Sequence, residues 1–438
     1  MKQVGIAVVG CGTVGGATAK LLHTDRKMLS GKTGLDLNLK YIIDINFDNA
    51  RRLGLPESLF EKDISKALED KEITVMVELV GGTTLAKDFI LKMVEAGKHV
   101  VTANKALLAK HGKELFAAAR KNNVSISFES SCGGGIPIVR ALYDGVISNR
   151  IDALYGIVNG TCNYILTEMT GKGKSYDDAL SDAQRDGLAE ADPTLDVTGG
   201  DSAHKLAILA SLAFNCHVNL EHIPVEGIDK LELMDVKFGS ELGYVVKLLA
   251  IAHREESGIA LRVRPAFIGT DHPLAWVSGP FNAISVYGHS VGHTMYYGRG
   301  AGGTPTASAI ISDIISAGIG SMKLLFDTLT IWPDVTPEAS QLKTEDIHGR
   351  YYIRCMVADQ PGVLASITKI LGDNMISISS FLQKEPYEET SSSVPLVITT
   401  HTAREGNILK ALAEMKNLPV VTREPVLINI VDEHEELI

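Results

Sequence analysis

The sequence predicts an α/β protein made of three units. Short apolar segments alternate with helical segments through the first part of the chain, which is typical of a doubly wound parallel sheet. After residue 136 the helices lengthen and strand patterns follow one another, which predicts a mixed α+β region. The final part reads β-α-β-β-α-β, the ferredoxin-like arrangement. A chain of 438 residues is long enough for such a division.

The first unit opens with a buried-strand pattern, VGIAVVG, that runs directly into GCGTVGGATAKLLH. Gly10, Gly12 and Gly15 form a G-x-G-x-x-G motif between this strand and a helix, with Thr13 and Val14 in the same turn. The first glycine permits the turn, the second lets the backbone approach a pyrophosphate, and the third allows close packing. The positive end of the helix would face the phosphates. A plain strand-to-helix turn is the alternative, but the context favours a dinucleotide-binding Rossmann domain.

The second strand pattern, LKYIIDIN, ends at Asp44, the usual place for an acid that holds the ribose hydroxyls. The spacing from the glycines exceeds the usual ~20 residues, so SGKTGLD is expected to be an inserted loop. Further alternation completes the predicted domain, 1–135, to which a segment at about 300–330 is expected to return. The expected elements are the strand TVMVELVGG, a helix at 86–97, the strand KHVVTA, a helix at 106–121 and the strand VSISFESS.

The second unit, 136–300, contains the strand patterns GIALRVRPAFI, FNAISVYG and HTMYYGRG. Residues 331–349 hold two prolines and many polar residues and are expected to be a linker. The third unit spans 350–432. Its expected elements are a strand at 350–358, a helix at 362–373, strands at 376–384 and 394–402, a helix at 404–416 and a strand at 420–431, with ETSSSV as a loop.

Composition excludes several classes of protein. Hydrophobic residues make up 45% and charged residues 22%, as in ordinary globular proteins, and the net charge of −11 argues against nucleic-acid binding. Five scattered cysteines without a CxxC motif indicate a reduced, cytoplasmic protein without a zinc site. The apolar run Leu206–Ala210 is far too short to span a membrane, and the N-terminal apolar segment is too short for a signal peptide.

The stretch EADPTLDVTGGDSAHKLAIL, residues 190–209, carries the most distinctive chemistry. Four acids, among them Glu190 and Asp196, lead to Lys205 at the start of a helix. Asp201 and Lys205 share a helix face, and an ordinary surface pair or a helix cap at Asp201 are the bland interpretations. However, the residues that follow, LAILASLAF, leave no polar face. Burial and the helix dipole favour a neutral lysine while Asp201 favours a charged one, and such a balance suits proton transfer.

Three other segments are candidates. Lys105, in VVTANKALL, follows a strand at the edge where parallel sheets bind ligands, although a solvated lysine at a helix start is equally compatible. ESSCGGGIP, residues 129–137, places three glycines after Cys132. This loop could hold a nucleophilic thiol, could turn its carbonyls toward a ligand or cation, or could be a flexible connection. NGTCNYIL, residues 159–166, is either a helix cap or a substrate loop.

Six segments together resemble homoserine dehydrogenase, over residues 1 to about 330, and AEADPTLDVTGGDSAHK is highly specific to that family. They are GCGTVG, TANKALL, ESSCGGGIPI, GIVNGTCNYIL, GLAEADPTLDVTGGDSAHKLAILA and YGRGAGGTPTASAI. The tail, with VADQPGVLASIT, resembles an ACT regulatory domain. The family reduces L-aspartate 4-semialdehyde to L-homoserine with a nicotinamide cofactor, on the route to threonine and methionine. The resemblance makes 136–300 a catalytic and dimerisation domain and implies a homodimer or homotetramer.

The resemblance also implies roles for individual residues. Glu190 holds the substrate ammonium, with Gly187 supplying backbone and Asp196 near the amine. Asp201 and Lys205 lie at the reacting carbon, with Lys205 as proton donor and acceptor. Lys105 contacts the substrate or the nicotinamide. The expected cofactor-binding residues are Gly10, Gly12, Thr13, Val14, Gly15, Asp44, Lys105 and Gly302. A monovalent cation, sodium or potassium, is implied at Glu129 and the carbonyls of Cys132, Gly134 and Ile136.

Two positions depart from the family pattern. The family often has a basic residue where Ile43 stands, which weakens the expectation of a 2′-phosphate clamp and favours NAD, although Arg51 and Arg52 could still serve NADP. Cys162 stands where threonine is usual, and nothing suggests that this abolishes binding.

The tail is expected to bind L-threonine, because of the place of the enzyme on the threonine route. Its turn DQPGVLA puts Asp359 and Gly362 before a helix start, where backbone N–H groups can meet a carboxylate, and Asn374 is a further expected ligand. A role in dimerisation only is the alternative.

Two other functions compete with this interpretation. A thiol-dependent semialdehyde dehydrogenase would use Cys132 as nucleophile. A non-catalytic sensor would bind nucleotide and amino acid, but it would have no need of both Lys105 and Lys205.

Overall fold

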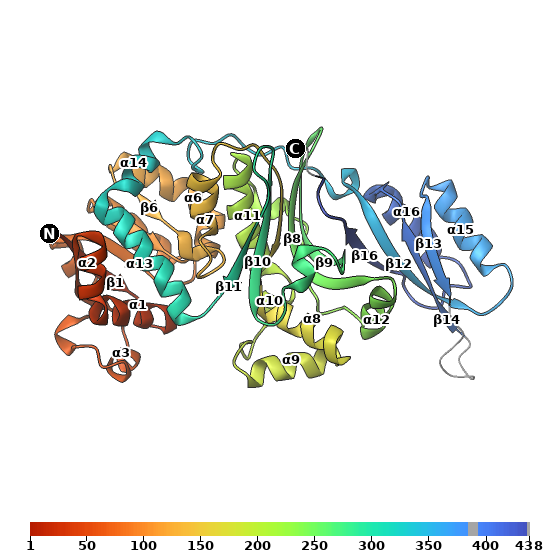
Figure 1. Cartoon of the computed structure of the whole chain (residues 1–438), viewed down its shortest axis with the longest axis horizontal. Coiled ribbons are helices and arrows are strands. Elements are labelled where there is room, and N and C mark those ends of the chain that lie inside the picture. The colour runs from red at the N-terminus through yellow and green to blue at the C-terminus, as the bar shows by residue number, and fades with distance from the viewer. Residues whose placement is uncertain (384–392, 436–438) are drawn as a thin grey trace.

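The structure is a computed structural model that describes residues 1–383 and 393–435. Two sheets follow one another along the long axis of the molecule (Figure 1). The smaller sheet and its helices, with the N-terminus, lie at the left of the view. The larger sheet begins in the middle and continues to the right, into the part coloured blue. This arrangement confirms the predicted α/β class.

The first sheet has six parallel strands in the order β3-β2-β1-β4-β5-β6, the doubly wound arrangement. From Val4 to Val9 every residue of β1 is buried, as expected for a strand covered on both faces. The strands are β1 (Lys2–Val9), β2 (Leu35–Ile43), β3 (Phe60–Glu61), β4 (Ile73–Glu78), β5 (His99–Thr102) and β6 (Ile126–Ser127). Helices of this part are α1 (Thr13–Thr24), α2 (Arg26–Thr33), α3 (Asp48–Arg52), α4 (Ser65–Glu69), α5 (Leu85–Glu95) and α6 (Lys105–Lys121).

The polypeptide returns to this first sheet much later. Helix α13 (Gly303–Ile319) packs along α1, and an ideal Cβ on Gly318 would lie 2.9 Å from a methyl group of Val4. Helix α14 (Ser321–Thr328) follows after a sharp bend.

The expectation of an inserted loop at SGKTGLD is wrong. Most of that stretch is the end of α2, which closes at Gly34 in the left-handed region, with φ of 71°. Strand β2 begins at once at Leu35. The longer spacing between the glycine motif and Asp44 therefore comes from an extra helix and a longer strand.

The second sheet has ten strands, nine of them in the order β11-β10-β7-β8-β9-β16-β12-β14-β13, with β15 beside β12. Its first five strands are β7 (Ile151–Ile157), β8 (Tyr244–Glu255), β9 (Gly258–Gly269), β10 (Phe281–Gly288) and β11 (Gly292–Arg299). Helices α7 (Ile138–Arg140), α8 (Gly160–Lys172), α9 (Tyr176–Arg185), α10 (Thr194–Val197), α11 (Gly200–Phe214) and α12 (Leu233–Glu241) belong to the same part. Short 3-10 turns lie at Glu57–Leu59, Glu129–Ser131, Leu220–His222, Pro273–Trp276 and Thr344–Asp346, and a π-helical turn at Ala141–Gly145.

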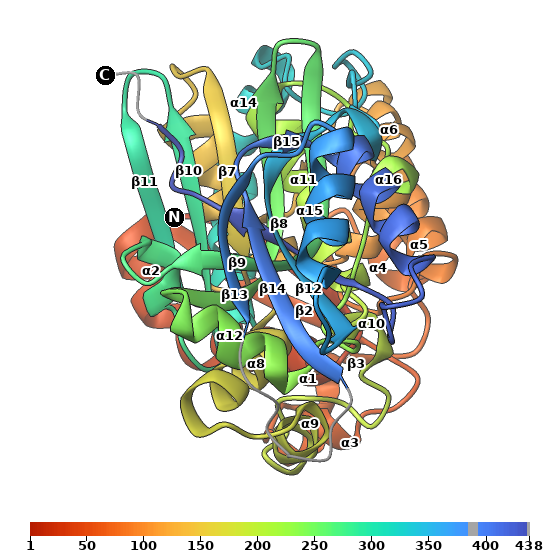
Figure 2. The same cartoon turned by 90° about the vertical axis from the view of Figure 1, so that its right-hand side faces the viewer.

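The tail forms the predicted β-α-β-β-α-β unit, which is nearest the viewer in Figure 2 with α15 and α16 to the right of β13 and β14. Its elements are β12 (His348–Ala358), α15 (Val363–Asp373), β13 (Ile378–Gln383), β14 (Ser393–Thr400), β15 (Ala403–Arg404), α16 (Glu405–Lys416) and β16 (Val426–Val431). Residue 384, where the third predicted element was to end, and most of the predicted ETSSSV loop lie outside the described residues.

The sheet of the tail is continuous with the sheet that precedes it. Strand β16 pairs in parallel with β9, with Asn429 opposite Ala266 and Val431 opposite Ile268. Buried ion pairs cross the same junction: Arg354 Nε lies 2.6 Å from Asp235 Oδ1. The strands of the tail therefore extend the second sheet, and the tail is not a separate domain on a flexible linker.

Among the described residues, no single helix is long and apolar enough to cross a membrane. Helices α13 and α14 reach the length and apolar composition of a membrane span only when taken together, and they are bent by 79° relative to each other.

Candidate active site

The N-terminal ends of two helices bring the predicted catalytic residues together. Lys105 is the first residue of α6, whose N-cap Asn104 accepts a hydrogen bond from the backbone N–H of Leu107. Asp201 lies in the first turn of α11. Its Oδ1 is 2.8 Å from Lys105 Nζ and its Oδ2 is 2.7 Å from Lys205 Nζ. One carboxylate is thus clamped between two lysines that are far apart in the sequence.

The clamp is buried and oriented by the backbone. Asp201 is 3% exposed, and Lys205 Nζ also donates to the carbonyl of Val158 at 2.6 Å. The alternative of Asp201 as a helix cap is wrong, because the N-cap is Gly199 and no capping side chain accepts a hydrogen bond from the start of this helix. The other alternative, a solvated surface pair, fails because Lys205 is buried too.

Electrostatics keep the central carboxylate ionised. Burial alone would raise the pKa of Asp201, but the two lysines outweigh it and hold this pKa well below its usual range. For Lys105, burial would lower the pKa, and the attraction of Asp201 reverses the effect and raises it. Burial raises the pKa of Asp196, against the hydrogen bond from Asn159.

Asn159 belongs to the segment that was predicted to be either a helix cap or a substrate loop. Its Oδ1 accepts from the backbone N–H of Cys162 and so caps α8. Its Nδ2 donates to Asp196 Oδ1 at 2.8 Å and to Asp201 Oδ2 at 2.9 Å. The helix-cap interpretation is confirmed. The substrate-loop interpretation stays a prediction, and the cap residue also joins the two acids.

A cavity of about 690 Å³ connects these residues with the glycine motif. At one end lie Lys105, Gly187, Glu190, Asp196, Asp201 and Lys205. At the other end lie Thr13, Val14 and Gly302. Glu190 is exposed at the rim, where it can meet a substrate that enters from solvent. The cavity therefore holds both the predicted substrate residues and part of the predicted cofactor residues.

The glycines of the motif have the predicted steric roles. Gly10 has φ of 97°, and an ideal Cβ on it would lie 2.6 Å from the backbone of Leu79. A Cβ on Gly15 would lie 1.9 Å from the carbonyl of Gly10. A Cβ on Gly12 would meet nothing within 4 Å, so space is open at this position, and its approach to a pyrophosphate stays a prediction.

A second helix N-terminus meets the first at this end of the cavity. Helix α13 begins after Gly302, which has φ of 119°. An ideal Cβ on Gly303 would lie 3.1 Å from the carbonyl of Thr13, so the starts of α1 and α13 are in contact. The starts of both helices present backbone N–H groups and positive helix-dipole charge at this end of the cavity, which suits a diphosphate.

Asp44 lies at the end of β2 beside the glycine turn. Its carboxylate accepts hydrogen bonds from the backbone N–H groups of Cys11, Ile45 and Asn46. The two arginines that follow are engaged nearby: Arg51 pairs with Glu57, and Arg52 donates to Asn49.

The Glu129 loop is built around two buried acids. The Glu129 carboxylate accepts hydrogen bonds from the backbone N–H groups of Val139 and Arg140 at 2.9 and 2.7 Å. The backbone N–H of Glu129 donates to the carboxylate of Asp313. Burial raises the pKa of Glu129 to about 7 and that of Asp313 to about 8. The carbonyl of Ile136 accepts from the N–H of Ile138. With the carboxylate so occupied, a cation in this loop would meet backbone carbonyls.

No group of three or more His, Cys, Asp or Glu side chains within residues 1–383 and 393–435 is arranged to hold a metal. A carbonyl-lined cation site is a different arrangement and uses none of these clusters.

Cys132 is poorly suited to nucleophilic catalysis. It is fully buried, and burial raises the pKa of its thiol to about 12, so the thiolate is scarce at neutral pH. Its sulfur faces the carbonyl of Lys205 at 3.9 Å. The thiol-dependent alternative finds no support in this geometry.

We expect Cys132→Ser to keep a kcat close to that of the unaltered protein, because the hydrogen bonds of the thiol are made with the carbonyl of Lys205 and the hydroxyl of Ser131 and not with a base. Steady-state kinetics with L-homoserine would measure it. Complete loss of activity in a variant with an unchanged far-UV circular dichroism spectrum would revive the thiol mechanism.

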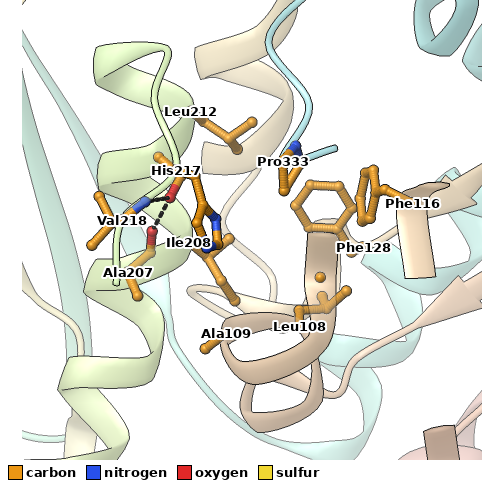
Figure 3. A pocket seen from close by; sticks show the side chains of 12 residues that line it. Leu108, Ala109, Phe116, Phe128, Ala207, Ile208, Leu212, His217, Val218 and Pro333 are labelled. Atoms are coloured by element: carbon orange, nitrogen blue, oxygen red, sulfur yellow. Dashed lines mark hydrogen bonds between the residues drawn. The ribbon is translucent and has the colours of Figure 1, made fainter. Parts of the chain in front are cut away.

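The helices that carry the clamp pack through an apolar seam (Figure 3). Leu108 and Phe116 of α6 face Ile208 and Leu212 of α11 around a small cavity of about 30 Å³, which Pro333 closes from the third side. The seam fixes α6 against α11, and with them Lys105 against Asp201.

The predicted effector residues lie in the tail. Asp359 and Gly362 are exposed in the turn before α15, and Gly362 caps that helix with φ of 89°. Asn374 is buried after its last turn, and its Nδ2 donates to the carbonyl of Ile370 and to Glu414.

Comparisons with known proteins agree with this geometry. Residues 10–129 match the family described as homoserine dehydrogenase, NAD binding domain, residues 137–315 match homoserine dehydrogenase, and residues 351–420 match the ACT domain. The chain is 40% identical to a homoserine dehydrogenase of Neisseria gonorrhoeae, covering 99% of this chain and 100% of that protein. It is 42% identical to one of Pseudomonas aeruginosa, covering 98% and 99%.

Solved structures give the same result. A crystal structure of a homoserine dehydrogenase from Thiobacillus denitrificans has a TM-score of 0.92 at 40% identity and covers 99% of both chains. A hyperthermophilic archaeal homoserine dehydrogenase in complex with NADPH has a TM-score of 0.61 at 27% identity, over 72% of this chain and 98% of that one.

A Rossmann domain, a cavity with an acid–lysine clamp and an ACT domain define a nicotinamide-dependent oxidoreductase of amino-acid metabolism. The chain belongs to the homoserine dehydrogenase family and is an oxidoreductase.

Proposed function

We propose that Lys205 exchanges the proton when this enzyme interconverts L-homoserine and L-aspartate 4-semialdehyde. The observation that supports this role is the clamp Lys105–Asp201–Lys205 in the cavity that leads to the glycine motif. In the reducing direction Lys205 gives its proton to the carbonyl oxygen that becomes the hydroxyl. In the oxidising direction it removes the hydroxyl proton. The nicotinamide cofactor supplies or accepts the hydride when bound.

Asp201 orients this chemistry without reacting. Its carboxylate stays ionised, holds Lys205 at one oxygen and holds Lys105 at the other. Lys105, partly exposed in the cavity, directs its positive charge toward the reacting oxygen or the nicotinamide.

The acids at the rim bind the substrate ammonium. Glu190 and Asp196 line the same cavity as the lysines, and Gly187 offers backbone beside them.

We expect Glu190→Gln to raise the KM for L-homoserine strongly, because it removes a charge partner of the ammonium, while kcat falls less. Steady-state kinetics at saturating cofactor measure both constants. Glu424→Gln, at an exposed acid of the tail that pairs with Lys416, is the control, and an unchanged KM for Glu190→Gln would contradict the assignment.

The cofactor end favours NAD over NADP. The Asp44 carboxylate suits ribose hydroxyls and would repel a 2′-phosphate. Arg51 and Arg52, the nearby cations that could counter this repulsion, are paired with Glu57 and Asn49. Because an archaeal relative has been solved in complex with NADPH, both cofactors belong in the assay.

A monovalent cation, sodium or potassium, fits the Glu129 loop. Gly133 and Gly134, with φ of 69° and 56°, allow the loop to turn its carbonyls inward, and hard oxygen ligands suit an alkali ion. The backbone carbonyls of Glu129, Cys132, Gly134 and Ile136 would hold it. Its role would be structural, keeping the loop in place beneath the cavity.

L-Threonine is the proposed effector of the ACT domain, held at Asp359 and Gly362 before the start of α15. Asn374 lies at the other end of that helix and bonds Ile370 and Glu414, so in this structure it is not part of the same turn. Coupling between such sites is usually ~1–3 kcal/mol, or about 5–150-fold in affinity. A homodimer or homotetramer is proposed as well. Its support is an exposed apolar groove at the edge strand β11, where Trp276 and Tyr297 are 80% and 55% exposed.

One assay tests the function: reduction of NAD+ and of NADP+ with L-homoserine, with potassium, sodium or N-methylglucamine as the only monovalent cation, and with or without L-threonine. We expect turnover, faster with NAD+, dependent on the alkali ion and inhibited by threonine. No turnover with either cofactor would contradict the proposal. Sedimentation in the same buffers gives the oligomeric state.

The cysteines, all free in the structure, fit a cytoplasmic location.

A further inference from the structure

Two buried asparagines near the cavity differ in their hydrogen bonds. Asn163, on α8, donates to the carbonyls of Gly279 and Phe281 and accepts from Lys247. Asn282, on β10, is 1% exposed, and neither its Nδ2 nor its Oδ1 has a hydrogen-bond partner within the described residues. Native proteins rarely bury an amide without partners. The second asparagine therefore calls for an explanation that packing alone does not give.

Asn282 lies in the wall of the active-site cavity, close to both Gly160 and Gly300. It lines the cavity together with Gly160 and Gly300. Gly160 follows Asn159, which bonds the acids of the substrate end. Gly300 belongs to the turn that leads into α13, whose start contacts Thr13 at the cofactor end. The amide is thus placed between the substrate and cofactor sides.

The turn lies directly against the amide without bonding it. An ideal Cβ on Gly300 would be 1.9 Å from Asn282 Nδ2 and 2.5 Å from its Oδ1. Residues 300–303 read Gly-Ala-Gly-Gly, and Gly302 already has φ of 119°. Glycine tolerates most backbone conformations, so the peptide groups on both sides of Gly300 can rotate at little cost.

We infer that Asn282 is a positioning residue that fixes the Gly300–Gly302 turn when the nicotinamide cofactor binds. A primary amide has both donor and acceptor capacity, so it can bond a backbone carbonyl and a backbone N–H of the turn together. Cofactor phosphates bound at the start of α1 would lie beside this turn, because Gly303 is in contact with Thr13. The inference rests on the cofactor half of the proposed function and does not depend on the substrate.

Asn282→Ala separates this role from a packing role. Removing an amide that has no partner should leave the thermal midpoint of the cofactor-free protein unchanged or higher. The Kd for NAD+, or for NADP+ if that binds more tightly, should rise about tenfold, and a tenfold change equals ~1.4 kcal/mol. At saturating cofactor, kcat should stay near the unaltered value. Calorimetric titration of the binary complex measures Kd without homoserine.

Asn163→Ala is the matched control, because it removes a fully bonded amide of the same type. It should lower the thermal midpoint of the cofactor-free protein. Gly300→Ala supplies a second variant, since its Cβ would collide with the Asn282 amide. In the Asn282→Ala background the collision is relieved, so the double variant should melt like Asn282→Ala and bind cofactor equally weakly.

Two results would overturn the inference. A lower thermal midpoint of cofactor-free Asn282→Ala with an unchanged Kd would make the residue structural. A reduced kcat with an unchanged Kd would assign it to the chemical step. If the unaltered protein binds NAD+ but does not oxidise L-homoserine, the proposed function fails, and the comparison of Kd values still decides the role of Asn282.

Discussion

Replacing Lys205 by alanine should reduce kcat by about 10²–10⁴-fold, the usual contribution of a general acid–base group. Lys205 is buried, lines the cavity, and donates hydrogen bonds to Asp201 and to the carbonyl of Val158. Its ammonium group therefore makes no ion pair at the protein surface. The KM for L-homoserine should change little, because Glu190 and Asp196 remain at the rim. Steady-state kinetics, with cofactor affinity measured separately, would show whether the loss is confined to kcat.

Two further variants sharpen this test. Lys369→Ala removes a lysine with the same i,i+4 carboxylate spacing on the exposed face of α15, and it should leave kcat unchanged. Lys205→Arg keeps the positive charge but not an acid of suitable strength, so it should be nearly as slow as Lys205→Ala. A near-normal kcat for Lys205→Ala would refute the proton role. Recovery with arginine would show that only charge is required.

Local patterns explain how much of the site was predictable. The pairing of Asp201 with Lys205 follows from helix spacing, and the apolar residues after them already indicated burial. The contact of Asp201 with Lys105 was not predictable from spacing, because it depends on how α6 packs on α11. The unpartnered amide of Asn282 could not be predicted for the same reason, because its surroundings, Gly160 and Gly300, come close to it only in the folded protein.

The fold divides in a similar way. The parallel sheet and the tail were predictable because each strand or helix there has its own period and its own turn residues. Strand β8, Tyr244–Glu255, was missed because its first nine residues, apolar except for Lys247, do not reveal their period. The pairing of β16 with β9 was missed because backbone pairing between distant strands leaves no local pattern.

That pairing changes how the effector can be tested. Truncation near residue 345 would remove the partner strand of β9 and leave Asp235 without Arg354. Loss of threonine inhibition in such a fragment would then report unfolding as readily as loss of an effector site. Asp359→Ala, at an exposed position in the turn before α15, tests the effector in the full-length protein.

Replacing Glu405 by glutamine should have the largest effect on stability. Glu405, on α16, is 1% exposed and accepts from Arg262 at 3.1 Å and from Arg264 at 2.7 Å, both on β9. The hydroxyl of Tyr351 donates to the same carboxylate. Without the negative charge of Glu405, the two buried guanidinium groups of β9 lose the carboxylate that they share. Breaking a buried ion pair from one side costs about 3–5 kcal/mol.

The urea concentration at the midpoint of unfolding, followed by far-UV circular dichroism, measures this effect for Glu405→Gln, and it should fall clearly. Asp346→Asn is the matched control, because it breaks an ion pair with Arg404, the residue before Glu405, where the side chains are 45% and 50% exposed. Such exposed pairs contribute ~0–1 kcal/mol, so its midpoint should hardly move. Equal midpoints for the two variants would mean that this cluster does not hold the tail to the preceding sheet, and that the pairing of β9 with β16 and the Arg354–Asp235 ion pair join them.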